Sequence, residues 1–233
     1  MKRKKYSLLL TVFILFMLTI SCSKMMSLDM YGLHGNVKTF VEQQYEVVLV
    51  DGEWKQGKMK LGYHYKAFFD TNGNPEMRQA MDNKDSIMQK VIVKTEGNQL
   101  VEEVKYDAAG NLTGTTFFDR RVGDQQKFTD IGIDGEKKLM GKFWYKNGRV
   151  IKHSMQFFEE GKKRREQITL YEYDMKGNFK RRIDEGVIGG KSIIETYRYL
   201  EFDDQDNWTK RLNYTGAGRK KPNKISIRTY EYY

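Results

Sequence analysis

The chain has 233 residues, and its 41 lysines and arginines exceed 31 aspartates and glutamates, which gives a formal net charge of +10. A single cysteine excludes an internal disulfide, and three histidines leave few side chains for a metal site. Two prolines exclude long proline-rich linkers, and the length allows one domain with a sizeable core or two small ones.

The first residues have the layout of a bacterial export signal. Residues 2–5 are all basic, and residues 6–21 form an apolar run that ends at the only cysteine, Cys22. A retained transmembrane helix is the first alternative, but sixteen residues span only about 24 Å of a hydrocarbon core that is about 30 Å thick. A cleaved signal without lipid is the second, and it does not explain why the cysteine stands at the processing point.

Ser21-Cys22 resembles the lipobox of bacterial lipoproteins, although Thr19 stands where that pattern usually has Leu, Val or Ile. The resemblance implies that residues 1–21 are a signal peptide and that Cys22 is the lipidated first residue of the mature chain. Residues 22–30 would then be a lipid-anchored tether, and residues 31–233 a single antiparallel β domain. Because the signal carries four positive charges and no negative ones, the mature charge falls from +10 to +6.

Glycine-centred turn signals recur along the rest of the chain, separated by short segments rich in Tyr, Phe, Val, Ile and Thr. This composition predicts an all-β fold, an antiparallel meander of successive hairpins. The sheet could stay open and curved or close partly into a barrel. A helix over residues 76–90 is an alternative, although Asn74-Pro75 and Asp82-Asn83 interrupt it.

Four turns share the pattern Asp-x-x-Gly-Asn, with an aromatic residue before the aspartate. The Asp carboxylate can accept a hydrogen bond from a backbone N–H two residues on, and Gly and Asn tolerate positive φ, so the pattern predicts chain reversal. In the fourth turn Asp206 replaces the glycine. The predicted turn residues are Asp70, Gly73, Asn74, Asp107, Gly110, Asn111, Asp174, Gly177, Asn178, Asp203 and Asn207.

The stretch over residues 171–178, YEYDMKGN, is similar to the YD repeat of the RHS family. Together with the lipobox, the opening LHGNVK at 33–38, DNWTKR at 206–211 and the terminal RTYEYY, it looks like the YD-repeat-like lipoproteins of Bacteroidota. That resemblance implies an antiparallel β architecture and no established activity. In this group acidic residues after the cysteine favour surface display. Since residues 23–26 lack them, the analogy places the domain facing the periplasm.

No catalytic or metal-binding constellation is recognisable. His34, His64 and His153 have no partner at metal-ligand spacing, and no nucleophile elbow or phosphate-binding loop occurs. The adjacent carboxylates at 102–103, 159–160 and 203–204 should point to opposite faces of a strand. A calcium loop starting at Asp70 fails because Pro75 takes the glycine position. We expect no cofactor, no metal and no catalytic residue.

Strict alternation over residues 151–157 predicts a half-buried strand, with Ile151, His153, Met155 and Phe157 on one face. Several basic clusters could attract a polyanion if the hairpins bring them together. The alternative is that they protect exposed sheet edges. The candidate polyanion contacts are Lys162, Lys163, Arg164, Arg165, Arg181, Arg182, Lys210 and Arg211.

These observations favour a membrane-anchored, non-catalytic envelope lipoprotein that acts as a binding or scaffold module. Trp208 and Trp144 would be contact residues unless they are core. Its partners would be the membrane, through the lipid anchor, and an envelope protein or glycan, and not nucleic acid. One alternative is a periplasmic glycan or peptide hydrolase that uses carboxylates from different strands. Another is direct binding of anionic lipid or lipopolysaccharide through the basic clusters.

Overall fold

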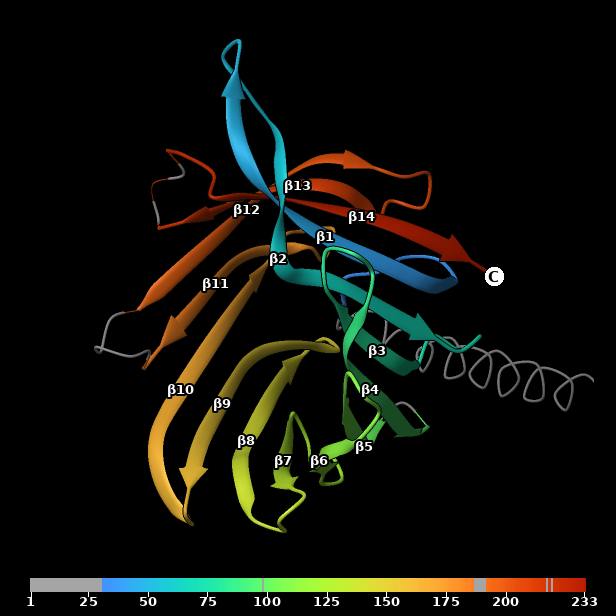
Figure 1. Ribbon diagram of the computed structural model, residues 1–233, viewed down its shortest axis with the longest axis vertical. Helices are drawn as coiled ribbons and strands as arrows, with labels where there is room; N and C mark the ends of the chain where they lie inside the picture. The colour runs from blue at the N-terminus through green and yellow to red at the C-terminus, as the bar shows by residue number, and fades with distance from the viewer. Residues whose placement is uncertain (1–30, 98, 187–191, 217, 219) are drawn as a thin grey trace, which may run out of the picture.

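The computed structural model describes residues 31–97, 99–186, 192–216, 218 and 220–233 (Figure 1). The predicted signal peptide (1–21), the tether (22–30) and the lipidation site Cys22 lie outside the described residues. Within the described part, no helix is both long and apolar enough to cross a membrane.

Fourteen antiparallel strands follow one another around a closed barrel, and β1 completes it by pairing with β14. The predicted all-β meander is therefore confirmed, and the sheet closes fully. The alternative helix over residues 76–90 is wrong, because β3 and β4 occupy that stretch. The strands are β1 (Val37–Val50), β2 (Glu53–Phe69), β3 (Pro75–Met81), β4 (Ile87–Glu96), β5 (Gln99–Asp107), β6 (Leu112–Phe118), β7 (Gln125–Gly132), β8 (Lys137–Lys146), β9 (Arg149–Glu159), β10 (Lys162–Tyr173), β11 (Phe179–Glu185), β12 (Ile193–Phe202), β13 (Trp208–Thr215) and β14 (Lys224–Tyr232).

The Asp-x-x-Gly-Asn turns form by local hydrogen bonding, as the sequence predicts. One carboxylate oxygen of Asp70 accepts the backbone N–H groups of Asn72 and Asn74, both at 2.8 Å. The side-chain amide of Asn74 donates to the other oxygen at 2.9 Å. Only Gly73 adopts positive φ, at 81°. The asparagine therefore serves as a hydrogen-bond donor and not as a second left-handed residue.

A further turn of this kind was not predicted from the sequence, because it lacks both signature residues. Asp82 accepts the backbone N–H groups of Lys84 and Ser86 at 2.8 and 2.9 Å. Asp85 takes the glycine position with φ of 64°, as Asp206 does with 63° in the turn after β12. Aspartate tolerates this region better than most residues. The first carboxylate is thus the constant part of the motif.

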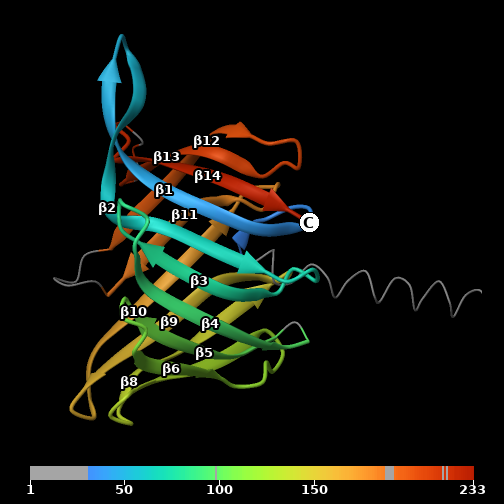
Figure 2. The same ribbon diagram turned by 45° about the vertical axis from the view of Figure 1, so that its right-hand side comes forward.

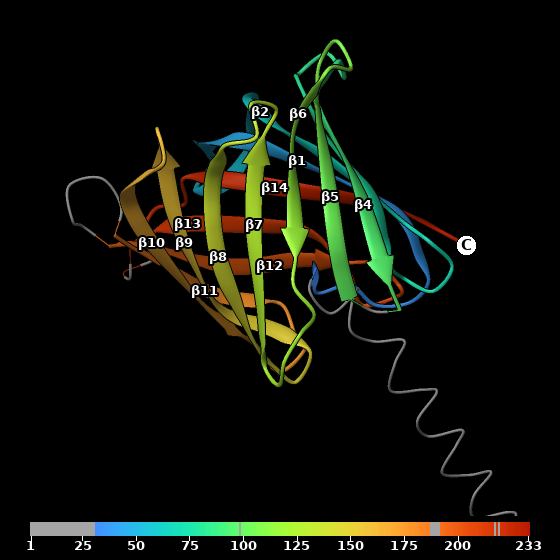
Figure 3. The ribbon, with the colours of Figure 1, turned by 90° about the horizontal axis from the view of Figure 1, so that it is seen from below.

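The two sides of the barrel cross at a steep angle, with β4 to β8 in front of β11 to β14 (Figure 3). The far halves of β1 and β2 pair only with each other and project beyond the barrel as a hairpin (Figure 2). Trp54 and Val47 of this hairpin pack against a buried cluster of Leu212, Tyr214 and Ile225. The hairpin therefore covers part of the outer face of β13 and β14.

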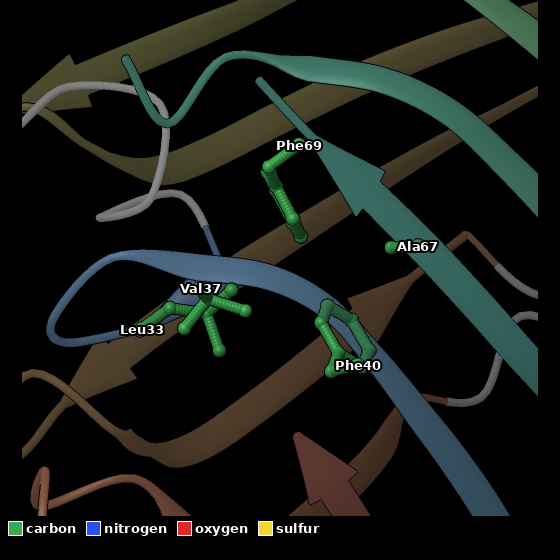
Figure 4. Packing of buried hydrophobic residues seen from close by; sticks show 5 residues of the cluster. All are labelled: Leu33, Val37, Phe40, Ala67 and Phe69. Atoms are coloured by element: carbon green, nitrogen blue, oxygen red, sulfur yellow. The ribbon is translucent and has the colours of Figure 1, made fainter. Parts of the chain in front are cut away.

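A second apolar cluster fills the barrel where the described chain begins (Figure 4). Phe40 and Phe69 are each 1% exposed, and their rings lie 6.0 Å apart. Tyr31 packs its ring against both, at 6.0 Å from Phe40 and 5.4 Å from Phe69. The remaining members are Leu33, Val37 and Ala67. This cluster joins the segment before β1 to the first two strands.

Candidate binding site inside the barrel

A cavity of about 350 Å³ lies inside the barrel, bounded by strands β3 and β5 to β11 and by Tyr31. Its volume is at the lower end of the roughly 300–1,000 Å³ typical of small-molecule sites. The lining residues are Tyr31, Arg78, Leu100, Glu103, Lys105, Thr116, Phe118, Phe128, Leu139, Phe143, Val150, His153, Met155, Tyr171, Tyr173 and Phe179. Eight of these sixteen side chains are aliphatic, phenylalanine or methionine, and three more are tyrosine rings, so the site is mainly apolar.

The side of the cavity formed by β8 to β11, which we call the apolar wall, is a continuous run of rings. Phe143 meets His153 edge-on with centroids 5.8 Å apart, and His153 is 5.6 Å from Tyr171. Phe179 continues the run at 5.4 Å from Tyr171. These residues face the same side because each is opposite, or nearly opposite, an inward residue of the next strand.

The predicted face of residues 151–157 is confirmed in part. His153 and Met155 line the cavity, as the alternation indicated. Ile151 is passed over in the pairing of β8 with β9, where Tyr145 pairs with Val150 and Trp144 with Lys152. Because of this bulge, Val150 and not Ile151 occupies the inward position. A bulge depends on the partner strand, so the single-strand pattern could not reveal it.

Gly141 gives the wall its shape on β8. A Cβ at this position would lie 2.1 Å from the backbone oxygen of Ser154 and 2.6 Å from the ring of Phe128. The absence of a side chain lets Phe128 lie flat across the strand, stacked at 4.9 Å on Phe143. Because residue 141 has no side chain, the Phe128 ring can occupy this inward space and stack on Phe143.

The side of the cavity formed by β3, β5 and β6 is charged, and we call Arg78, Glu103, Lys105 and Thr116 the polar wall. Arg78 pairs with Glu103 at 2.5 Å, across the intervening β4. Lys105 pairs with Asp130 at 2.7 Å, and the Thr116 hydroxyl donates to the same carboxylate oxygen at 3.0 Å. The cavity is thus amphipathic, with ion pairs on one side and rings on the other.

His153 is the titratable group of the apolar wall. Burial, followed by the nearby Arg182 guanidinium, lowers its pKa to about 4, although Asp184 opposes the shift. The imidazole is therefore uncharged near neutral pH. Its Nδ1 lies 3.1 Å from the Tyr171 hydroxyl, and its buried Nε2 has no hydrogen-bond partner within the described part of the chain.

The segment before β1 lies across the same end of the barrel as the turns after β2, β10 and β12. The backbone N–H of His34 donates to the Asn207 side chain at 2.7 Å, and that side chain donates to the His34 carbonyl at 2.8 Å. Gly32 approaches the carbonyl of Gly177, which would lie 3.2 Å from a Cβ at residue 32. Tyr31 is therefore held at the edge of the cavity by two of the predicted turns.

The other half of the barrel interior is filled by a buried carboxylate, two arginines that bind it, and a tryptophan ring on which the arginines stack. Glu42 on β1 accepts hydrogen bonds from Arg211 at 2.9 Å and Arg228 at 2.8 Å. Both guanidinium groups lie 4.2 Å from the centroid of Trp208. Burial raises the Glu42 pKa, but the two arginines outweigh it and lower the value to about 2. This buried triad joins β1, β13 and β14 and leaves the cavity to β3–β11.

The two tryptophans predicted as contact residues lie in different places, one in the core and the other on the side of β8 that faces away from the cavity. Trp208 is only 2% exposed and belongs to the core, so it cannot be a surface contact. Trp144 lies on the opposite side of β8 from the cavity, with the ammonium groups of Lys152 and Lys142 at 4.7 and 5.2 Å from its ring. Neither tryptophan lines the cavity.

The predicted polyanion residues do not share one surface. Arg211 is 7% exposed and bound to Glu42 inside the barrel, so its assignment as a polyanion contact is wrong. Arg182 pairs with Asp184 at 3.0 Å, and its side chain is 37% exposed. The stretch over 162–165 begins β10 next to the β9–β10 turn, whereas Arg181 and Lys210 lie nearer the other end of the barrel. Ion pairs or ring contacts hold most of the exposed members: Lys163 with Glu166, Arg164 with Glu159, Arg165 over Phe157, Arg181 with Glu172, and Lys210 with Glu201.

Of the three adjacent carboxylate pairs, only residues 102–103 lie together within a strand, and these two point to opposite faces as predicted. Glu103 faces the cavity and binds Arg78, whereas Glu102 binds the exposed Lys94 at 2.5 Å. Glu159 and Glu160, at the end of β9, instead both pair with Arg164, at 2.9 and 4.0 Å. Inside the barrel, Glu42, Glu103, Asp130 and Asp184 are each paired with a cation. Among the described residues, no group of three or more His, Cys, Asp or Glu side chains is placed to hold a metal ion.

A second, more open groove of about 480 Å³ runs along the outer ends of β12, β13 and β14. Here β13 and β14 pair over only four residues each, and the Tyr230 hydroxyl donates to the Trp208 carbonyl at 2.8 Å. The lysine and the aspartate of the groove already have partners, since Lys210 binds Glu201 and Asp203 accepts the Tyr232 hydroxyl. The interior cavity is less open, and its lining is richer in aromatic and aliphatic side chains, so it is the better candidate for a ligand.

No known family model matches this chain, and no curated protein matches it by sequence. Among solved structures, it is similar to a porin-like protein from Bacteroides uniformis, with 12% identity, a TM-score of 0.42, and coverage of 85% of this chain and 98% of that one. It is also similar to a LolA superfamily protein from Nitrosomonas europaea, with 10% identity, a TM-score of 0.29, and coverage of 91% and 89%. Both scores are too low to support a conclusion about ligand or partner.

Proposed function

We propose that this protein is a non-catalytic binding module that holds a small apolar molecule inside its barrel, at a bacterial membrane to which an acylated Cys22 anchors it. The resemblance to YD-repeat-like lipoproteins supports the anchor and a periplasm-facing position. The cavity of about 350 Å³ inside the barrel, with its apolar wall, supports the binding role, and this single observation carries the proposal.

The side chains around the cavity favour binding over catalysis. A general acid or base needs a group that titrates near the working pH and can reach the substrate. His153 is held uncharged by a pKa of about 4, and the cavity carboxylate Glu103 is engaged by Arg78. The hydrolase alternative therefore has no candidate pair of carboxylates at this site.

The experiment uses the full chain purified from membranes in detergent. Its mass tests the anchor, because cleavage before Cys22 and added acyl groups are expected, and an uncut leader would contradict them. Binding is then measured with 1-naphthylamine, which is small enough for the cavity and whose fluorescence shifts to shorter wavelength in apolar surroundings. The Val150→Phe variant fills part of the cavity and should weaken binding about tenfold, which corresponds to about 1.4 kcal/mol.

The matched control is Val122→Phe, because Val122 is 79% exposed whereas Val150 is 6% exposed. If Val150→Phe does not fold, Leu139→Trp in the cavity is compared with Leu112→Trp, where Leu112 is 47% exposed. Equal probe binding by the cavity and surface variants would show that the interior is not the site.

A further inference from the structure

Cations predominate among the charged side chains that contact the cavity. Two cations, Arg78 and Lys105, and one carboxylate, Glu103, belong to the lining, and His153 is uncharged near neutral pH. The two ion pairs balance in total charge, but the second carboxylate lies behind the lining. Asp130, which pairs with Lys105, is not among the lining residues.

Both cations keep more exposed surface than their partners. The side chains of Arg78 and Lys105 are 25% and 23% exposed, against 12% for Glu103 and 17% for Asp130. The buried Nε of Arg78 has no hydrogen-bond partner among the described residues. A head group in the cavity therefore meets more cationic than anionic surface at this wall, which favours an anionic acceptor.

The apolar wall limits the rest of the ligand. Phe143, Tyr171 and Phe179 face the ion pairs across the cavity and offer no charge of their own. At about 30 Å³ for each water-sized group, the cavity holds about a dozen heavy atoms. A compact anion alone would leave these rings in contact with water, and the chain of a long lipid would extend beyond the cavity.

We infer that the ligand of this cavity is a single-chain carboxylic acid of about a dozen heavy atoms. Its carboxylate binds Lys105 and Arg78 at the polar wall, and its hydrocarbon chain lies against the apolar wall of β8 to β11. This assignment depends on the proposed function, because it specifies the ligand class of the same cavity.

The test is displacement of the bound naphthylamine probe at pH 7.5 by decanoic acid, decanol and decylammonium, which differ only in the head group. The acid should displace the probe at a concentration at least tenfold lower than the ammonium compound does. Lys105→Met keeps most of the apolar stem and removes the charge. It should weaken binding of the acid about tenfold and leave binding of the alcohol unchanged.

Lys94→Met is the matched control, because Lys94 pairs with Glu102 outside the cavity and its side chain is 58% exposed. It should change none of the three affinities. Because Lys105→Met leaves Asp130 without its cation, Lys105→Met/Asp130→Asn is measured as well and should show the same selective loss for the acid. The double variant keeps the test valid if the single one folds poorly.

The outcomes separate this assignment from the proposed function. Equal displacement by the acid and the ammonium compound, or equal loss of acid and alcohol binding in both Lys105 variants, would overturn the carboxylic-acid ligand while leaving an apolar binding site. Failure of the probe itself to bind inside the barrel would overturn the proposed function and the ligand class together.

Discussion

At the scale of single residues, His153 shows how the interior controls charge. Its ring is packed between Phe143 and Tyr171, and its pKa of about 4 keeps it uncharged in the folded protein. An unfolded histidine titrates near 6.5. Because the pKa of His153 is lower in the folded than in the unfolded chain, this residue should make the folded protein less stable in acid.

The sign follows from proton binding. As pH falls from about 6.5 to 4, the unfolded chain takes up a proton at His153 before the folded chain does, so folding stability is lost across that window. The loss should be on the order of 2 kcal/mol, since the ring is partly exposed. Urea unfolding of the wild type should give a lower free energy of unfolding at pH 5 than at pH 7, which is part of this loss.

His153→Phe removes the titrating group and keeps a ring of similar size, so its stability should change less between pH 7 and pH 5 than that of the wild type. Tyr171→Phe is the control, because it removes the hydroxyl beside Nδ1 and retains the histidine. The same pH dependence in wild type and His153→Phe would show that other groups cause the acid sensitivity.

At the scale of elements, equivalent turns differ in their surroundings. Gly110 and Gly177 occupy the same position of the motif, with φ of 85° and 89°. A Cβ on Gly110 would meet nothing within 4 Å, whereas one on Gly177 would lie 2.2 Å from the guanidinium of Arg149. Comparing the two positions separates backbone strain from loss of space.

Gly110→Ala should cost about 1 kcal/mol through positive φ alone. Gly177→Ala should cost up to about 1 kcal/mol more, because the Arg149 guanidinium must also move from its place over the Tyr173 ring. Denaturant midpoints of the two variants provide the measurement. Equal destabilisation would mean that Arg149 can move away at no cost.

The same turns explain how much of the fold could be predicted. Each of these turns depends on a carboxylate and backbone N–H groups within five residues. The β1–β2, β8–β9 and β9–β10 hairpins turn instead through two consecutive residues of positive φ, so local signals were sufficient for the meander. The turn at Asp82 escaped prediction because Asp85 and Ser86 replace the usual Gly-Asn. The inward role of Val150 escaped because the bulge at Ile151 depends on pairing with β8.

At the scale of the whole molecule, closure and the cavity depend on contacts between distant parts of the chain. The pairing of β1 with β14 joins the two ends of the described domain, and no local pattern in either strand specifies that partner. The cavity could not be predicted for the same reason, since Arg78 and Glu103 meet across β4. The alternation over residues 151–157 was a sequence signal for part of this lining, since it placed His153 and Met155 on one face.

The closing pair of strands is also where the barrel should be most sensitive to loss of a single charge. Glu42 lies between Arg211 and Arg228, and its removal as Glu42→Gln would leave two buried guanidinium groups without a carboxylate. Breaking a buried ion pair on one side costs about 3–5 kcal/mol. Glu201→Gln is the matched control, because it breaks an exposed pair with Lys210 and should cost no more than about 1 kcal/mol.

Acid provides a second measure of the same carboxylate. Because the pKa of Glu42 is lowered to about 2, the stability that it contributes is present above pH 4.5 and is lost as pH falls toward 2. Wild type should therefore lose stability steeply in this range, whereas Glu42→Gln starts lower and should show a shallower decline. Unfolding by urea at pH 7, 4 and 3 separates the two curves. Parallel curves would mean that the triad does not hold β1 against β13 and β14, and that backbone pairing alone closes the barrel.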